Sequence, residues 1–287
     1  MATISAETVK TLRERTGAGM MDCKRALEAA SGDLTTAADW LRKQGIAKAA
    51  KKAGRSASEG MIAECVSADG TTVVFVEVNC ETDFVAKNDE FRAFAAGVAQ
   101  LALDQNPPTV EALRDLAMNG MSVSQRQTEL TAKIGENIVV ERMVRRAASA
   151  QQKNGRYIHA GEKIGVLVIF DDANGKLTAE AAKDVAMHVA AMDPPYLRRD
   201  TVPANTVERE RDIIRAQLAD EKKPAEILEK IVAGRINKFY AEQCLEEQVF
   251  VKDPQGKQTV AQALKALDGQ IRIAEMVRFQ VGDREGA

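Results

Sequence analysis

The chain has 287 residues, of which 45% are hydrophobic and 29% charged, which is enough for two or more domains with a sizeable core. Its net charge of -2 argues against general nucleic-acid binding, and no apolar run approaches the ~18 residues of a membrane span. Four cysteines and two histidines show no zinc-binding spacing, and the N-terminus lacks the features of a signal or transit peptide. We therefore expect a cytoplasmic protein with reduced thiols and no bound metal; the elements described below predict its α+β fold class.

Residues 1–55 are predicted to form a small domain of three helices. Ser5 is placed to cap the first helix, the second runs from about Asp22 to Ala30, and Asp33 caps the third. Residues 16–20 form a tight turn after the first helix, because two glycines permit backbone angles that other residues resist. Met20 and Met21 could fill the small core or contact a partner, and the chemistry of methionine suits both.

The basic residues of 42–58 have no acidic neighbour in sequence. A nucleic-acid patch is one interpretation, but no aromatic residue is interleaved for base stacking. We favour a solvated helix end, stabilised by the helix dipole, that runs into a Gly/Ser linker.

Residues 56–148 and 149–287 are predicted to be two related ββα subdomains. The first has a hairpin over residues 61–78 and a helix from Asn88 to about Leu103. Short helices near 110–118 and 122–133 and a strand over 138–144 complete it. The second has strands over 155–159 and 163–170, then a helix over 178–192.

A helical hairpin is predicted as an insert over about residues 204–250. Two apolar stripes carry this prediction, and they could either pack back on the core or join two copies of the chain. A helix over 259–267 and an alternating strand over 271–281 are expected to close the second subdomain.

One loop carries an unusual pair of residues. Between the strand that ends near Cys80 and the helix after Asn88, the chain places a carboxylate beside a large aromatic ring, at Asp83 and Phe84. Phe84 could tuck under its own loop, as aromatics usually do. It could instead be an exposed anchor for a partner's pocket, with Asp83 facing the partner's donors.

Two long motifs resemble the bacterial elongation factor Ts family, nucleotide exchange factors for elongation factor Tu. The first is Glu-Val-Asn-Cys-Glu-Thr-Asp-Phe-Val-Ala-Lys at residues 77–87. The second is Leu-Arg-Glu-Arg-Thr-Gly-Ala-Gly-Met-Met-Asp-Cys-Lys-Arg-Ala-Leu at residues 12–27. The similarity covers nearly the whole chain and favours the anchor interpretation of Phe84.

The resemblance implies three sets of partner-binding residues. An exchange wedge is implied at Thr82, Asp83, Phe84 and Val85. The N-terminal three-helix module, similar to ubiquitin-associated domains, would contribute Arg13, Thr16, Gly17, Ala18, Gly19, Met20 and Met21. The second subdomain would contribute His159, Gly161 and Gly165.

The resemblance also implies a function in translation. The chain would bind elongation factor Tu carrying GDP, displace elements of the magnesium and phosphate site, and so allow GTP to load. Some members of the family dimerise through the helical hairpin, so a homodimer of this chain is one expectation. No cofactor, membrane or nucleic-acid partner is expected. Some relatives continue into a further helical module, which we expect this chain to lack.

No catalytic residue is predicted. Cys80 with His159 is the one enzymatic pairing considered, and no protease or thiol-transfer context surrounds the cysteine. His188 is expected to be a satisfied histidine at the core edge, within reach of Asp184 four residues earlier. The sequence contains no phosphate-binding glycine motif, so we expect no nucleotide site.

Overall fold

The computed structural model describes residues 4–159, 161–219, 221 and 223–283. They divide into two compact units, and the α+β class is confirmed. The first comprises residues 4–146, 161–163 and 279–283, and the second comprises 147–159 and the described part of 164–278. The end of the chain, where a further module was expected to be missing, lies outside the described residues.

The first unit begins with three helices, α1 (Ala6–Thr16), α2 (Met20–Ala29) and α3 (Leu34–Ala50). Leu12, Cys23 and Leu27 are fully buried between them. Ser5 and Asp33 cap α1 and α3 by accepting hydrogen bonds from Thr8 N and Thr36 N. Helix α2 starts at Met20, earlier than predicted, so Met20 belongs to a helix and not to the preceding turn.

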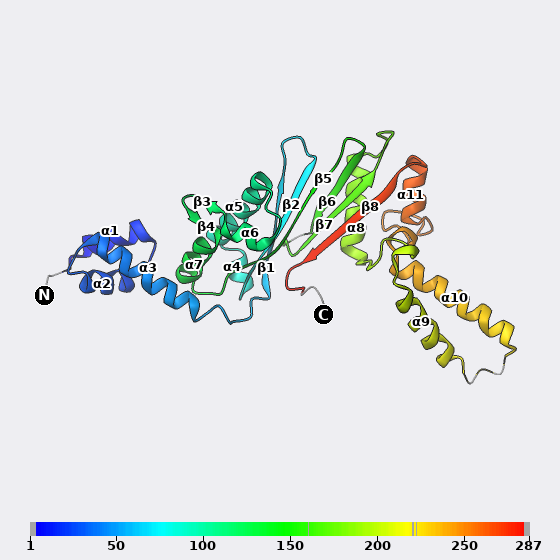
Figure 1. Ribbon diagram of the computed structural model, residues 1–287, viewed down its shortest axis with the longest axis horizontal. Helices are drawn as coiled ribbons and strands as arrows, with labels where there is room; N and C mark the ends of the chain where they lie inside the picture. Colours follow the sequence, from blue (N-terminus) through cyan, green and yellow to red (C-terminus); the bar gives the residue numbers. More distant parts are fainter. Residues whose placement is uncertain (1–3, 160, 220, 222, 284–287) are drawn as a thin grey trace. The chain divides into compact units, whose positions relative to one another are not determined.

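A three-stranded sheet follows, in the order β1 (Glu59–Val66), β2 (Thr72–Cys80) and β5 (Val139–Ala147). Strands β1 and β2 form an antiparallel hairpin, with Glu59 opposite Cys80. Helix α5 (Asp89–Gln105) packs against both strands of the hairpin (Figure 1). Its buried stripe, which includes Phe91 and Val98, fills the core of this unit.

Between α5 and β5 the chain forms a small subassembly of short elements. They are α6 (Val110–Asp115), β3 (Ala117–Met118), β4 (Met121–Ser122) and α7 (Val123–Ile134). Ser122 and Gln125 cap the start of α7 reciprocally, and Gly135 ends it with a φ of 93°. The chain then enters β5 through Glu136 and Asn137, so α7 fixes where these two residues lie.

The second unit repeats the hairpin-and-helix arrangement. Strands β6 (Gln152–Ile158) and β7 (Ile164–Asp171) are antiparallel, and β8 (Arg272–Gln280) pairs with β7. Helix α8 (Ala179–Met192) lies so close to β6 that a Cβ at Gly155 would stand 2.2 Å from the Ala182 carbonyl oxygen. This contact requires glycine.

The predicted helical hairpin is α9 (Ala204–Gln217) and α10 (Ala225–Gln243), an antiparallel pair in Figure 1. Its apolar stripes bury Ile214, Leu218, Val232 and Ile236 against one another. The short helix η1 (Arg199–Thr201) precedes the hairpin, and η2 (Leu245–Glu247) and α11 (Val260–Leu267) follow it. Leu245 is buried in the core of the unit, so the hairpin proper ends before it.

The basic segment 42–58 is largely exposed, as expected of a solvated helix end. Two of its side chains also make ion pairs, Lys48 with Asp22 at 3.0 Å and Arg55 with Glu81 at 3.5 Å. One sequence-based interpretation is wrong in detail. His188 does not pair with Asp184, which contacts Lys252 instead. His188 is fully buried, accepts a hydrogen bond from Val251 N on Nδ1, and therefore donates from Nε2 to Gln248. Burial in this site lowers the pKa of His188, because the imidazolium form is poorly solvated there.

Candidate partner-binding site

The segment Thr82–Val85 is the cap and the first three residues of a short helix, and not the expected loop. Helix α4 (Asp83–Ala86) follows β2 after two residues, and the Thr82 hydroxyl caps it by accepting a hydrogen bond from Val85 N at 3.4 Å. Val85 and Ala86 are buried in the core of the unit, whereas 81% of Phe84 is exposed. One face of this single turn therefore anchors it, and the opposite face presents the ring to solvent.

The exposure of Phe84 excludes the interpretation that its ring is tucked under the loop. An isolated exposed hydrophobic side chain is ordinary, but an aromatic ring held outward on a capped, anchored turn loses little conformational entropy on contact with a partner. We call residues 82–85 the wedge segment.

Asp83 adds a negative charge beside the ring. Its carboxylate accepts a hydrogen bond from Lys87 at 2.9 Å, one helical turn later. That bond, together with the positive charges of Lys87 and Lys163, lowers the pKa of Asp83. Asp83 is therefore ionised at neutral pH, and the wedge segment combines a carboxylate with an apolar ring.

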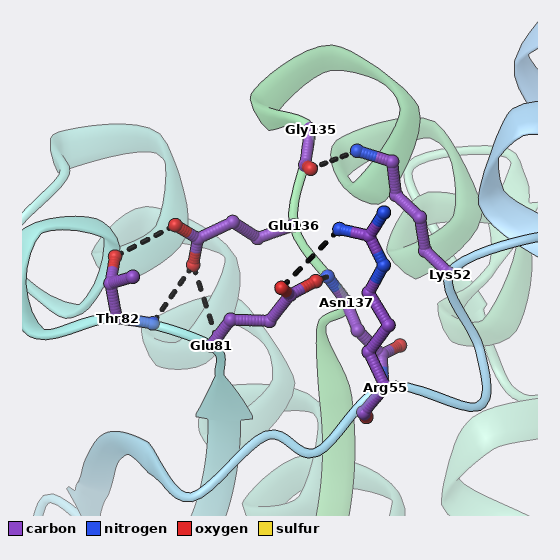
Figure 2. A network of polar contacts seen from close by, with 7 residues as sticks. All are labelled: Lys52, Arg55, Glu81, Thr82, Gly135, Glu136 and Asn137. Atoms are coloured by element: carbon purple, nitrogen blue, oxygen red, sulfur yellow. Dashed lines mark hydrogen bonds and ion pairs between the residues drawn. The ribbon is translucent and has the colours of Figure 1, made fainter.

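The base of the wedge segment is held by Glu136, which the sequence analysis missed. Figure 2 shows the Glu136 carboxylate facing the start of the segment. Its Oε2 atom accepts hydrogen bonds from the backbone amides of Glu81 and Thr82, at 3.1 and 3.0 Å. Its Oε1 atom accepts the Thr82 hydroxyl at 2.7 Å. No motif marks Glu136, because its contacts depend on where α7 ends.

The N-terminal residues singled out in the sequence lie around the turn between α1 and α2. Gly17 ends α1 with a φ of 67°, which favours glycine. Met20 and Met21 are 45% and 67% exposed, so they do not fill the core. Arg13 and Gly19 are also exposed, and Thr16 and Ala18 are half-buried.

A groove of about 700 Å³ lies beside this turn. It is lined by three of the predicted residues, Arg13, Gly17 and Met20, and also by Glu90 and Lys133 of the same unit. Glu90 and Lys133 form an ion pair at 2.7 Å. The methionines therefore project from a surface with an adjoining concavity.

The three residues predicted in the second subdomain differ in accessibility. His159 is exposed, and its Nδ1 lies 3.1 Å from the Tyr157 hydroxyl. Gly161 is exposed with a φ of 85°. Gly165 is buried in β7 opposite Ile158, so it can affect a surface contact only indirectly, through the conformation of the strand.

The structure gives no support to nucleophilic chemistry at Cys80. The thiol is fully buried and donates a hydrogen bond to the Thr82 carbonyl oxygen at 3.1 Å. Burial, with a further contribution from the negative charge of Glu136, raises the pKa of this thiol to about 12. A reactive cysteine needs the opposite shift, because the thiolate is the nucleophile.

Nowhere in the described ranges do three or more His, Cys, Asp or Glu side chains stand together as a metal site. Likewise, no described helix has both the length and the apolar composition needed to cross a bilayer.

Comparison with known proteins agrees with the motifs. The family model described as "Elongation factor TS" matches residues 81–283. Elongation factor Ts of Alkalilimnicola ehrlichii is 49% identical over 280 residues, which cover 98% of this chain and 92% of that protein. The proteins of the same name from Thioalkalivibrio sulfidiphilus and Clostridioides difficile are 47% and 45% identical, over 98% and 99% of this chain and 93% and 94% of theirs.

These similarities, together with the α+β fold, define a translation elongation factor. The chain belongs to the elongation factor Ts family.

Proposed function

We propose that this chain is the guanine nucleotide exchange factor for elongation factor Tu, and that the wedge segment drives GDP release. The observation that carries the proposal is Phe84, 81% exposed on a helical turn whose other face is buried. Family membership supplies the partner. The geometry supplies a rigid apolar ring beside an ionised carboxylate, which suits insertion next to helices of a GTPase.

The mechanism is one of linkage between two ligands of the GTPase. GDP and magnesium stabilise one arrangement of the phosphate-binding loop and the neighbouring switch helices. A partner that binds best when these elements are displaced weakens GDP binding, and GDP weakens the partner by the same factor. Phe84 would contribute desolvated contact area to the displaced state, and Asp83 would act on hydrogen-bond donors or repel the phosphates. Release of GDP then leaves the site open for GTP.

The other candidate surfaces would hold the GTPase without displacing GDP. Met20 and Met21 offer adaptable apolar contacts beside a groove, and methionine suits such surfaces because its side chain is flexible. His159 and Gly161 would meet a further part of the GTPase. Residues 1–55 contain 11 Lys/Arg and 6 Asp/Glu, and this positive charge would accelerate encounter with a negative surface.

We propose no covalent chemistry for this chain. Cys80, the candidate nucleophile, is buried with a pKa of about 12. An enzyme would be labelled by thiol-directed substrate probes, and an adaptor built on residues 1–55 alone would retain full activity in that fragment. The exchange-factor proposal predicts neither result. The proposed location is the cytoplasm, where translation takes place.

Association of two copies through the helical hairpin is a separate proposal. The inner apolar stripes of α9 and α10 pack against each other, so they are not available to a second copy. Ile213 and Ile227 remain on the outside of the hairpin, 41% and 46% exposed, and would supply the contact.

The direct test is release of a fluorescent GDP analogue from elongation factor Tu, in excess unlabelled GDP, with and without the chain. The proposal predicts that catalytic amounts accelerate release. A Leu267→Ala variant is a matched control, because Leu267 is an exposed apolar residue outside the predicted sites. Release that stays at the intrinsic rate with the wild-type chain would refute the proposed function.

A further inference from the structure

Glu136 makes a concentrated set of contacts with the wedge segment. The backbone amides of Glu81 and Thr82 and the hydroxyl of Thr82 take part in four hydrogen bonds. Three of these bonds end on the Glu136 carboxylate. The fourth is the cap that the Thr82 hydroxyl offers to Val85 N. The hydroxyl thus donates to Glu136 and accepts from Val85, which links the carboxylate directly to the first turn of α4.

The segment that carries Glu136 is itself held on both sides. Gly135, just before Glu136, ends α7. The two residues after Glu136, Asn137 and Ile138, are buried. The Asn137 amide donates to Glu81 Oε1 at 2.6 Å, so residues 136 and 137 both bind the chain just before the wedge segment. Hydrogen bonds to a carboxylate are stronger than those between neutral groups, which makes this a stiff junction.

The same junction binds the linker that leaves the N-terminal module. Lys52 Nζ donates to the Gly135 carbonyl oxygen, and Asn137 Nδ2 donates to the Arg55 carbonyl oxygen at 2.8 Å (Figure 2). The guanidinium of Arg55 lies 3.5 Å from the second carboxylate oxygen of Glu81. The three residues 135–137 therefore hold both the linker and the base of the wedge segment.

We infer that Glu136 is a positioning residue for exchange: its carboxylate fixes the orientation of α4 and thereby of Phe84. This inference rests on the proposed function of the wedge segment. Without the carboxylate, two backbone amides and a hydroxyl lose their acceptor, and α4 is held by its two buried side chains, its Thr82 cap and the Cys80 thiol bond to Thr82. Binding to the GTPase would then have to order α4 as well. This entropic cost weakens the binding of the chain to the displaced state of the GTPase.

The variants Glu136→Ala and Glu136→Gln separate positioning from general stability. Alanine removes both acceptor oxygens and, with them, all three hydrogen bonds. Glutamine keeps them in a different form: its Oε1 can accept both amides, while its Nε2 donates to the Thr82 hydroxyl oxygen. Glu129→Ala is the matched control, because Glu129 is a half-exposed acid on α7 that makes a surface ion pair with Arg126 at 3.6 Å.

The first measurement is amide hydrogen exchange over residues 81–88 in the free protein, which needs no GTPase. We expect Glu136→Ala to reduce protection of these amides about tenfold or more, while Glu136→Gln and Glu129→Ala stay within about threefold of wild type. Wild-type protection in Glu136→Ala would overturn the inference. So would an equal loss in Glu136→Gln, because that variant retains the hydrogen-bonding capacity. This result stands whether or not the chain proves to be an exchange factor.

The second measurement is the titration of GDP release. If Glu136 positions the wedge, Glu136→Ala lowers the maximal release rate about tenfold at an unchanged half-saturating concentration, and glutamine restores it. A merely structural role predicts the reverse, since partial unfolding removes active protein and raises the half-saturating concentration. Thr82→Val, which replaces the hydroxyl by a methyl group and so removes its bonds to Glu136 and Val85, is the milder second variant. A maximal rate within twofold of wild type in both Glu136→Ala and Thr82→Val would overturn the inference.

Discussion

Replacing Phe84 by alanine removes the ring while leaving the fold intact. The side chain is 81% exposed, so few of its contacts stabilise the free protein, and surface changes of this kind usually alter stability by no more than about 0.5 kcal/mol. Burying the exposed part, about 160 Å² of a ring of about 200 Å², at about 25 cal/mol per Å² gives an upper value of about 4 kcal/mol. Truncation of such an anchor costs about 2 kcal/mol or more, which is about 30-fold in the exchange rate constant.

The assay for this prediction is fluorescent-GDP release at saturating concentrations of each variant, paired with thermal unfolding. Phe91→Ala is the matched control, because Phe91 lies seven residues later and is fully buried. That variant should lose about 3–5 kcal/mol of stability. Phe84→Ala should instead melt close to wild type and exchange about 30-fold more slowly. Near-wild-type exchange by Phe84→Ala, or a melting temperature as low as that of Phe91→Ala, would refute the argument that the ring is a partner anchor.

Three further predictions concern other parts of the chain. Deleting residues 1–50, which spares the linker contacts at the wedge junction, should raise the half-saturating concentration while the maximal rate falls much less; a lost maximal rate would show that the module itself displaces GDP. Replacing residues 206–236 by a short loop should abolish any dimer in sedimentation and leave GDP release intact, and loss of release in a folded variant would contradict this. His188 has a lowered pKa in the folded state, so the unfolded state takes up a proton first as the pH falls. The contribution of neutral His188 to the free energy of unfolding is therefore complete above about pH 6.5, and it is lost as the pH falls from there towards the folded pKa. The fall in melting temperature between pH 7.5 and 5.5 should therefore be smaller in His188→Gln than in wild type, and an equal fall would contradict the role of His188.

The sequence was informative wherever a local pattern determines structure. The caps at Ser5, Asp33 and Asn88, each followed by an apolar stripe, place three helix starts correctly. The hairpin over β1 and β2 follows from alternation and a glycine turn. These features depend on neighbours within about one helical turn or one tight turn of the chain, so a single sequence contains the necessary information.

Contacts between distant segments were not predictable in the same way. The four-residue helix α4 is too short for any periodicity, and its cap depends on a hydroxyl that also binds residue 136. Glu136 itself looked like an ordinary residue between a helix and a strand. His188 was correctly expected to be satisfied, but its partners lie 60 and 63 residues away, and the local carboxylate pairs with a lysine instead.

The same contrast between local sequence and distant contacts applies to the site residues. Residue chemistry left Phe84, Met20 and Met21 open between core and partner contact, the family resemblance made them candidates, and the structure shows all three on the surface. Gly165 came only from the resemblance, and it lies buried in a strand. The hydrogen-bond network that supports the wedge segment could not be predicted from the sequence. It joins residues 52, 55, 81, 82 and 135–137, which only the fold brings together.

The central claim is that the chain and GDP oppose each other on one GTPase. The most direct test is to measure the affinity of the chain for nucleotide-free elongation factor Tu and for the same protein saturated with GDP and magnesium. The affinity of GDP is then measured with and without saturating chain. Linkage requires both ratios to be the same number, well above one, and Phe84→Ala should shrink both together. Equal affinity of the chain for the empty and the GDP-bound GTPase would contradict the account.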